Sequence, residues 1–209
     1  MILSFSGRIG SGKDTAAQIV QELYPEMNWQ IKGFADKLRQ VASLFLGIPP
    51  EELKKQEVKE WVLSREWADP DGTLITVRIF LQRLGTQAVR DGLCKSAWVN
   101  ALMIDYRSVI IEPEMDLGDD FPYFFEEVTP NWVVTDCRFP QEVEAIKNSG
   151  GTCIRIVRPD NPYPQSSHES ETAIDHIEML TIINDGNLEQ LKLRIKETVE
   201  PIINHAQSH

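Results

Sequence analysis

The most constraining feature of the sequence is a glycine-rich turn near its amino end. It reads Gly7-Arg-Ile-Gly-Ser-Gly-Lys-Asp-Thr15 and lies between an apolar run and a segment with helical periodicity. Gly7 and the pair Gly12-Lys13 have the G-x-x-x-x-G-K spacing of a P-loop. Glycines here let successive backbone N–H groups face a phosphate, and the following helix adds partial positive charge. The turn therefore predicts a nucleoside triphosphate site, with Lys13 on the β- and γ-phosphates.

One residue of this turn departs from the strict pattern. The motif places Ser or Thr directly after the lysine to hold Mg²⁺, whereas this chain has Asp14 there and Thr15 next. We expect Asp14 to hold the metal, directly or through a water, and Thr15 to contact phosphate. A turn that only caps a helix is the alternative, and the strand before it and the helix after it count against that. The predicted cofactor-binding residues of the turn are Gly7, Gly10, Ser11, Gly12, Lys13, Asp14 and Thr15.

Strand-length apolar segments alternate with helical patterns along the chain. The expected strands are 1–6, 29–34, 132–135, 152–157 and 180–183. Helices are expected from Asp14 to Pro25, around Leu38 to Gly47, and over 77–93, 96–107, 141–148 and 188–202. This alternation predicts an α/β fold, a three-layer parallel sheet of the P-loop NTPase type flanked by helices. Seven acids and no base lie between Glu112 and Val128, which suggests an exposed insertion.

Net charge and cysteine content limit the classes of binding partner and the cellular compartment that we expect. The 209 residues carry a net charge of −11, which disfavours a nucleic-acid-binding module or an anionic membrane as the main partner. Three scattered cysteines without a CxxC pair fit a reducing compartment. With no apolar run of about 18 residues and no signal-peptide pattern, we expect a cytoplasmic protein, in the host cytoplasm if it is phage-encoded.

Two further clusters carry polar side chains suited to phosphate. Arg78, Gln82, Thr86 and Arg90 recur every four residues and form one helical stripe, for which a solvated helix face is an equally good interpretation. Asp136 and Arg138 follow the strand at 132–135, where an acid can bind Mg²⁺ and a base can bind phosphate, although such a pair can also cap the next helix.

A third cluster follows the second expected strand. The segment Ala35-Asp-Lys-Leu-Arg39 opens a helix, and Asp36 there is commonly an N-cap. The four histidines, by contrast, lie in the last fifth of the chain and away from strand ends, so no catalytic histidine is expected.

With these motifs in order, the chain resembles the bacteriophage deoxynucleoside monophosphate kinases, a P-loop family related to adenylate kinase. The segments that carry the resemblance, in chain order, are Ser6 through Thr15, Phe34-Ala-Asp-Lys-Leu-Arg39, Leu81-Gln-Arg-Leu-Gly-Thr86, Trp98-Val-Asn-Ala, Thr135-Asp-Cys-Arg138 with Glu142, Ile156-Val-Arg-Pro159, His168-Glu-Ser-Glu171 and Asn184-Asp-Gly-Asn-Leu-Glu189. They run from the first strand to the last helix. The charged stretch 54–73 and the acidic stretch 112–128 carry none of it.

The resemblance implies phosphoryl transfer from ATP, with Mg²⁺, to a deoxynucleoside monophosphate. It implies one P-loop kinase domain over 1–209, with an acceptor-binding helical region about 36–110 and a lid about 158–176. The catalytic candidates are Lys13, Arg138, Arg78 and Asp36. The candidate substrate-binding residues are Arg39, Gln82, Thr86, Arg90, Trp98, Asp136 and Glu142. The candidate metal ligands are Asp14 and Asp136, and Asn184 and Gly186 are expected against the ATP adenine.

Two other functions fit parts of the pattern. Dephospho-coenzyme A kinase shares a similar glycine loop and an Asn-Asp-Gly-like segment, although Asp14 and the Leu81–Thr86 segment fit the phage family better. A P-loop regulatory protein without a small acceptor is the other alternative. The expected partner is a small-molecule nucleotide, not nucleic acid or membrane. The resemblance suggests a homodimer and leaves the oligomeric state open.

Overall fold

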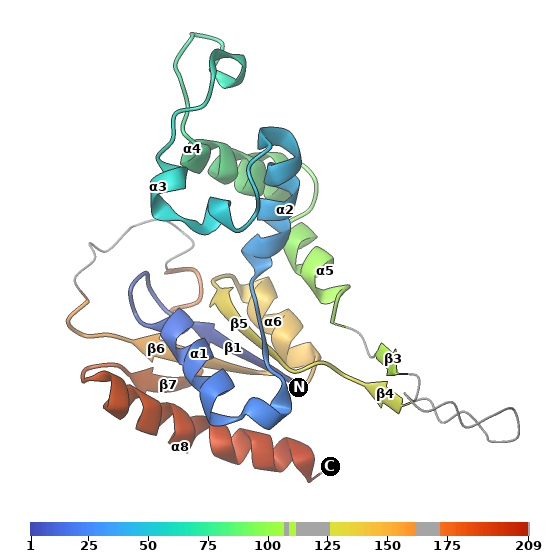
Figure 1. The fold of residues 1–209 in the computed structure, drawn as a ribbon, viewed down its shortest axis with the longest axis vertical. Coiled ribbons are helices and arrows are strands. Elements are labelled where there is room, and N and C mark those ends of the chain that lie inside the picture. Colours follow the sequence, from blue (N-terminus) through green and yellow to red (C-terminus); the bar gives the residue numbers. More distant parts are fainter. Residues whose placement is uncertain (107–108, 112–125, 162–171, 209) are drawn as a thin grey trace, which may run out of the picture. The chain divides into compact units, whose positions relative to one another are not determined.

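The computed structural model describes residues 1–106, 109–111, 126–161 and 172–208, with backbone alone at 109–111 and 126–128 (Figure 1). The chain forms two compact units. The sheet unit comprises Met1–Lys32 and Met103–His209, and the helical unit comprises Gly33–Leu102. Within the described ranges, no helix is both long and apolar enough to cross a bilayer.

The sheet unit is built on five parallel strands. They are β1 (Ile2–Ser6), β2 (Gln30–Lys32), β5 (Trp132–Cys137), β6 (Thr152–Val157) and β7 (Leu180–Ile183), in the order β2-β5-β1-β6-β7. The five segments match the expected strands, although β2 is shorter because Phe34 already begins a helix. Since β1 lies at the centre and is flanked by β5 and β6, its carboxyl end faces the place where ligands collect in such sheets.

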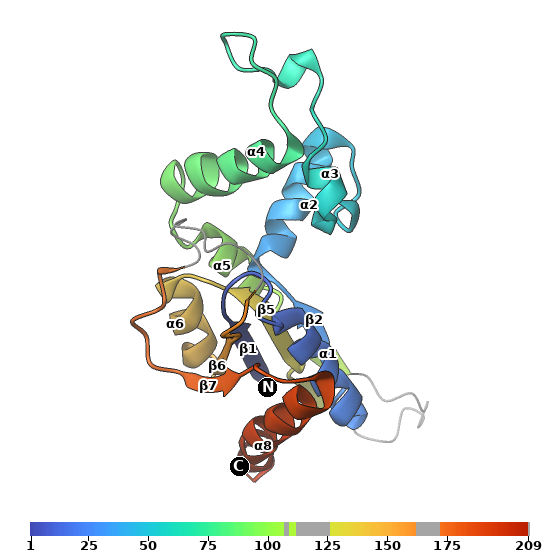
Figure 2. The same ribbon diagram turned by 90° about the vertical axis from the view of Figure 1, so that its left-hand side faces the viewer.

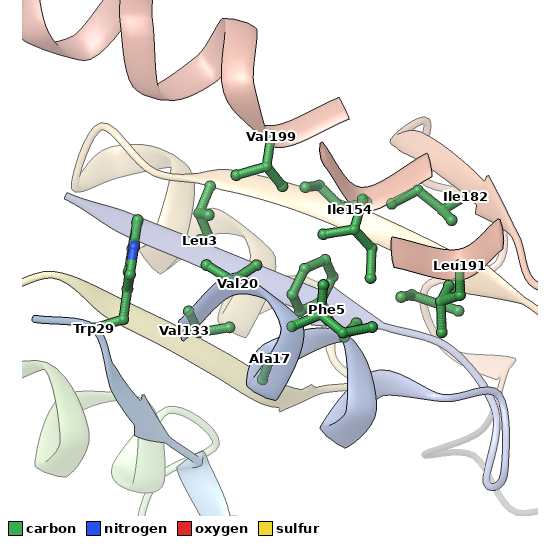
Figure 3. Close-up of a cluster of buried hydrophobic side chains, with 14 of the residues drawn as sticks. Leu3, Phe5, Ala17, Val20, Trp29, Val133, Ile154, Ile182, Leu191 and Val199 are labelled. Atoms are coloured by element: carbon green, nitrogen blue, oxygen red, sulfur yellow. The ribbon is translucent and has the colours of Figure 1, made fainter. Parts of the chain in front are cut away.

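Helices cover both faces of this sheet (Figure 2). α1 (Lys13–Leu23) and α8 (Leu188–Gln207) pack on one face, and α6 (Pro140–Asn148) packs on the other. The core between strands and the first face contains Leu3 and Phe5, which Figure 3 shows among side chains of α1 and α8. β1 is buried along its whole length, and Leu3 and Phe5 share one face because every second side chain of a strand points to the same side. The predicted parallel sheet flanked by helices is confirmed.

The sheet unit also contains elements that the pattern did not reveal. A 3₁₀ turn, η1 (Pro25–Met27), follows α1, and an antiparallel pair joins β3 (Val109–Ile111) to β4 (Glu126–Val128). The expected acidic insertion therefore ends in a strand, while 112–125 lie outside the described residues. Likewise 162–171, the middle of the expected lid, lie outside them.

The helical unit is assembled from short elements. They are α2 (Phe34–Leu46), η2 (Glu52–Lys54), α3 (Gln56–Lys59), η3 (Arg65–Trp67), α4 (Val77–Gln82), the π-helix η4 (Arg83–Asp91) and α5 (Ala97–Met103). α2 ends at Gly47, whose φ of 68° is the left-handed conformation that glycine adopts without strain. Four buried side chains, from Ala42, Leu53, Val58 and Val77, form the centre of its core.

Two helix predictions in this region need correction. The helix expected over 77–93 begins at Val77, but it changes from α to π register at Arg83 and ends at Asp91. The helix expected over 96–107 ends at Met103. Periodicity could not reveal the change of register, because a window of fifteen residues with a polar stripe every four positions fits either kind of turn.

Candidate active site

The glycine-rich turn connects β1 to α1 and has the backbone that its sequence predicts. Gly7, Gly10 and Gly12 all have positive φ, at 140°, 75° and 103°. A Cβ atom on Gly7 would lie 2.3 Å from the carbonyl oxygen of Ile156, so a side chain there would collide with β6. Both the conformation and the close approach therefore require glycine.

Lys13 is the first residue of α1 and is buried against the turn. Its Nζ donates to the carbonyl oxygens of Gly7, at 2.7 Å, and Arg8, at 2.8 Å. The preceding Gly12 offers no side-chain cap, so the N–H groups of the first helical turn are left for another acceptor. An ammonium group beside an uncapped helix N-terminus is an anion site in its simplest form.

A cleft of about 390 Å³ opens beside this turn. Its lining combines the turn with the chain after β6 and the loop between β7 and α8, and consists of Gly10, Gly12, Lys13, Asp14, Thr15, Arg158, Asn184, Gly186, Asn187, Leu188 and Leu191. The volume lies within the range of ordinary small-molecule sites. Seven of the nine expected cofactor-binding residues line it. Gly7 and Ser11 do not: Ser11 is buried, and its Oγ forms no hydrogen bond with any residue that the structure describes.

Arg158, Asn187, Leu188 and Leu191 are cleft residues that were not among the predicted site residues. Arg158 is the first residue of the expected lid, and it directly follows β6, so it lies at the carboxyl end of a parallel strand. The leucines belong to the apolar stripe of α8, and nothing in the stripe distinguishes a residue that faces a cleft from one that faces the core.

The end of β5 holds the acid and base predicted there. Asp136 lies within the strand rather than after it, beside a β-bulge: between the pairs Ser4↔Val134 and Ser6↔Cys137, β5 has one residue more than β1. Such bulges redirect side chains and are frequent next to active sites. Asp136 and Arg138 are both half-buried in the sheet unit, at the same edge as the turn.

Glu142 has a clear structural task. Its side chain is buried, and Oε2 accepts hydrogen bonds from the backbone N–H groups of Arg138, at 2.7 Å, and Phe139, at 3.0 Å. These contacts cap the N-terminus of α6 and fix the backbone that carries Arg138. Its predicted role as a substrate contact stays a prediction.

Magnesium is the cofactor metal that the resemblance implies. Among the described residues, no three His, Cys, Asp or Glu side chains gather into a metal cluster. Mg²⁺ in nucleotide sites needs only one or two carboxylates and takes its other ligands from water and phosphates. Asp14, an exposed carboxylate, and the hydroxyl of Thr15 both line the cleft and so fit the ion. Asp136, the other predicted ligand, does not line it.

The helical unit holds the remaining candidates. Asp36 lies in the first turn of α2, where Oδ2 accepts from the backbone N–H of Gly33 at 2.8 Å and Oδ1 contacts Arg39 at 2.6 Å and Lys54 at 3.2 Å. Burial alone would raise the pKa of Asp36, but the hydrogen bond and charge of Arg39, with Lys54, outweigh it and lower that pKa. The carboxylate therefore stays charged and holds two cations.

The stripe of Arg78, Gln82, Thr86 and Arg90 spans α4 and η4. In an α-helix, four residues overshoot a full turn by about 40°. In the wider π-helix four residues fall short of a turn, so the two deviations oppose each other and the stripe stays on one side. Gln82 and Thr86 are exposed, and Arg78 donates to Glu60 through Nε and Nη2 at 2.9 and 2.6 Å.

Trp98 is the least accessible of the candidates in this unit. Its side chain is buried, and its single polar group, the indole N–H, donates to the carbonyl oxygen of Gly85 at 2.9 Å. This bond ties α5 to the π-helix. A substrate contact by Trp98 stays a prediction, and it would have to use the ring alone.

Comparison with known proteins identifies the family. A family model described as deoxynucleotide monophosphate kinase matches residues 50–195. The chain belongs to this family. Deoxynucleotide monophosphate kinases from Escherichia phage RB69 and Enterobacteria phage T4 are each 29% identical to it, over 142 and 126 residues. These stretches are 68% and 60% of this chain but 52% and 46% of the relatives, so the chain spans about half the length of the phage proteins it matches.

A relative of similar length exists in a giant virus. A protein of Acanthamoeba polyphaga mimivirus is 27% identical over 211 residues, which is 96% of each chain. Among solved structures, shikimate kinase from Aquifex aeolicus aligns over the whole of both chains with a TM-score of 0.43 and 11% identity, too distant a likeness to bear on function.

Proposed function

We propose that this protein transfers the γ-phosphoryl group of ATP to a deoxynucleoside 5′-monophosphate, giving ADP and a deoxynucleoside diphosphate. The observation that carries the proposal is the cleft bordered by Lys13, Asp14 and Thr15 in a chain of the deoxynucleotide monophosphate kinase family. Lys13 and the N-terminus of α1 can bind the oxygens of a triphosphate, and Asp14 and Thr15 offer oxygen ligands for its Mg²⁺.

The chemistry needs no catalytic base. The second pKa of a phosphate monoester is about 6, so the attacking oxygen of the acceptor is largely ionised at pH 7. The difficulty is charge repulsion between two phosphates, and cations held in line relieve it. Lys13 and Arg138 of the sheet unit are the groups proposed to stabilise the transferring phosphoryl group. Mg²⁺, held by Asp14 with Asp136 as the second candidate, would supply further positive charge.

The acceptor is proposed to bind to residues of the helical unit. Arg39 and Arg78 have the planar forks that grip phosphate oxygens in pairs, and Arg90 completes the set of candidate cations there. Gln82 and Thr86 are exposed on α4 and η4, where they can bond a base or a sugar. Which base they accept, and whether they exclude a ribose 2′-hydroxyl, depends on contacts made with the bound acceptor.

A panel of acceptors tests the proposal. The protein would be incubated with ATP, Mg²⁺ and each common ribo- and deoxynucleoside monophosphate in turn, and with dephospho-coenzyme A, while the diphosphate product is detected directly. We expect ADP and a deoxynucleoside diphosphate in equal amounts with at least one deoxynucleotide. Binding of ATP without acceptor-stimulated turnover would favour the regulatory protein, and product from dephospho-coenzyme A alone would favour that kinase.

A further inference from the structure

Two asparagine side chains donate hydrogen bonds to backbone carbonyl oxygens of the P-loop. The Nδ2 of Asn184 donates to the carbonyl oxygen of Ser11 at 2.9 Å, and the Nδ2 of Asn161 donates to the carbonyl oxygen of Ile9 at 2.7 Å. Both asparagines follow strands of the sheet unit, Asn161 after β6 and Asn184 directly after β7. Because a carbonyl only accepts, the amide must present its NH₂ group in each contact.

The planarity of the peptide bond gives these contacts a consequence for the cleft. In a trans peptide the C=O and the next N–H point in opposite directions. A bond that holds the oxygen of Ser11 toward Asn184 therefore holds the N–H of Gly12 toward the other side, and the bond at Ile9 does the same for Gly10. Gly10, Gly12 and Asn184 line the cleft, while Ile9 and Ser11 do not, so the amide of Asn184 borders the same cleft as the two glycines.

The orientation of these two peptides needs support because the loop contains glycine at both positions. Gly10 and Gly12 have positive φ, and a glycine passes between positive and negative φ at little steric cost. Without an external partner, the peptides before them could rotate and turn carbonyl oxygens toward an anion. An oxygen in that position would repel phosphate where an N–H attracts it.

Asn184 is itself well anchored. Its backbone N–H donates to the carbonyl oxygen of Val157 at 2.6 Å, which fastens it between the ends of β6 and β7. Its Nδ2 also lies only 2.7 Å from where a Cβ on Gly12 would be, so the loop is packed directly against the amide. The asparagine thus transmits the position of the sheet to the loop.

We propose that Asn161 and Asn184 are positioning residues that aim the N–H groups of Gly10 and Gly12 at a polyphosphate chain before it binds. The inference rests on the proposed function, since the polyphosphate is that of the nucleotide donor. It gives Asn184 a different task from the adenine contact that the family resemblance implies. The two tasks make different predictions for a ligand that has phosphates and no base.

Inorganic tripolyphosphate is that ligand. Its affinity and that of ATP, both with Mg²⁺, would be measured by calorimetry for the wild type, Asn184→Ala and Asn161→Ala. We expect each variant to weaken both ligands by the same factor, about 3- to 10-fold, the change that the loss of one hydrogen bond produces. The ¹⁵N–¹H signals of Gly10 and Gly12 should also shift in the variants, which a general loss of stability would not cause.

Asn131→Ala is the matched control. Its Nδ2 also donates to a backbone carbonyl, that of Met27 at 2.7 Å, but it precedes β5 at the opposite end of the strands from the P-loop. It should leave both affinities unchanged. Asn161 and Asn184 are both half-buried and contact different carbonyl oxygens, so Asn161→Ala keeps the test decisive if Asn184→Ala does not fold.

Three results would overturn the inference. Weaker binding of ATP with unchanged binding of tripolyphosphate would make Asn184 a base contact. Unchanged binding of both ligands in both variants would show that the loop needs no external support. A wild type that binds neither ligand would remove the phosphate site itself. In contrast, equal losses for both ligands in a protein that phosphorylates no monophosphate would uphold the positioning role and refute only the proposed reaction.

Discussion

Lys13 in the sheet unit and Arg39 and Arg78 in the helical unit contact different kinds of partner. In the sheet unit, the Nζ of Lys13 is bonded to two neutral carbonyl oxygens. In the helical unit, Arg39 and Lys54 contact the carboxylate of Asp36, and Arg78 contacts that of Glu60. A phosphate that approaches Lys13 competes with these carbonyl dipoles, whereas one that approaches Arg39 or Arg78 competes with a full negative charge. Lys13 can therefore bind an anion at a lower electrostatic cost than Arg39 or Arg78, whose charges are already balanced by carboxylates.

The two units also differ in the size of their hydrophobic cores. Among the described residues, the main core of the sheet unit has fifteen buried side chains and that of the helical unit has four. The P-loop therefore rests on a well-packed support. The helical unit depends more on ion pairs, whose worth at the surface is small. Substitutions in the helical unit should therefore destabilise that unit readily, and they should have little effect on the cleft beside the P-loop.

Replacement of Lys13 is expected to have the largest effect on activity. Lys13→Ala should lower kcat by at least about two to three orders of magnitude, the loss typical when one donor to a transition-state anion is removed. The fold should persist, because the Nζ contacts to the carbonyl oxygens of Gly7 and Arg8 lie in the loop and not in the hydrophobic core. Turnover measured by product detection, beside a thermal unfolding curve, checks this. Lys192→Ala, which removes an exposed cation paired with Glu22, is the control, and near wild-type turnover in Lys13→Ala would refute the P-loop assignment.

Truncation of the helical core should have the next largest effect. Leu53 is fully buried in the small cluster, so Leu53→Ala should cost about 2–5 kcal/mol of stability. Hydrogen exchange should then speed up for amides of 33–102 more than for those of β1. Ile154→Ala, fully buried in the sheet unit, should give the reverse pattern. Equal acceleration across the chain in both variants would show that the two units unfold together.

Much of the sheet unit could be predicted from sequence because its signals are local. Apolar runs of strand length predict all five strands of the parallel sheet, and the spacing of Gly7, Gly12 and Lys13 predicts the glycine-rich turn between β1 and α1. Each of these features depends on neighbouring residues. The pair β3–β4 was missed because it joins segments on either side of the acidic stretch, and no local pattern announces such a pairing.

The helical unit shows where sequence reasoning ends. Its polar stripe was visible, but the π register that aligns the stripe was not, and neither were the partners of Arg78 and Trp98. Glu60 lies 18 residues before Arg78, in a stretch to which no function was assigned. The partner of a charged side chain depends on tertiary packing, and periodicity carries no information about it.

Protonation of Asp36 at low pH should lower the stability of the helical unit by a moderate amount. Its folded-state pKa is lowered, so its contribution is present above the ordinary pKa of an aspartate, about 3.9, and is lost as pH falls through the lower folded value. Asp36→Asn should lower stability at pH 7 by about 1 kcal/mol and flatten the loss below pH 4. Urea unfolding between pH 3 and 7 measures both. An unchanged slope below pH 4 would show that other carboxylates dominate.

The smallest expected effect tests whether the carboxylate of Glu60 weakens phosphate binding by Arg78. Glu60→Gln removes the charge that competes for Arg78 while keeping a side chain of the same size. If Arg78 grips the acceptor phosphate, KM for the acceptor should fall about two- to fivefold, the factor that corresponds to a surface ion pair, with kcat nearly unchanged. The gain should shrink at high salt, because screening already weakens the competing pair.

Asp69→Asn provides the comparison for this last effect. Asp69 pairs with Arg83, a second arginine of the same unit that is not a site candidate, and the two arginines are similarly exposed, at 41% for Arg83 and 36% for Arg78. Releasing Arg83 should leave KM for the acceptor unchanged. An equal fall of KM in both variants would mean that only the net charge of the unit matters, and no fall in Glu60→Gln would remove Arg78 from the acceptor site. A fall confined to Glu60→Gln would show that the charge of Glu60 limits the affinity of Arg78 for the acceptor phosphate.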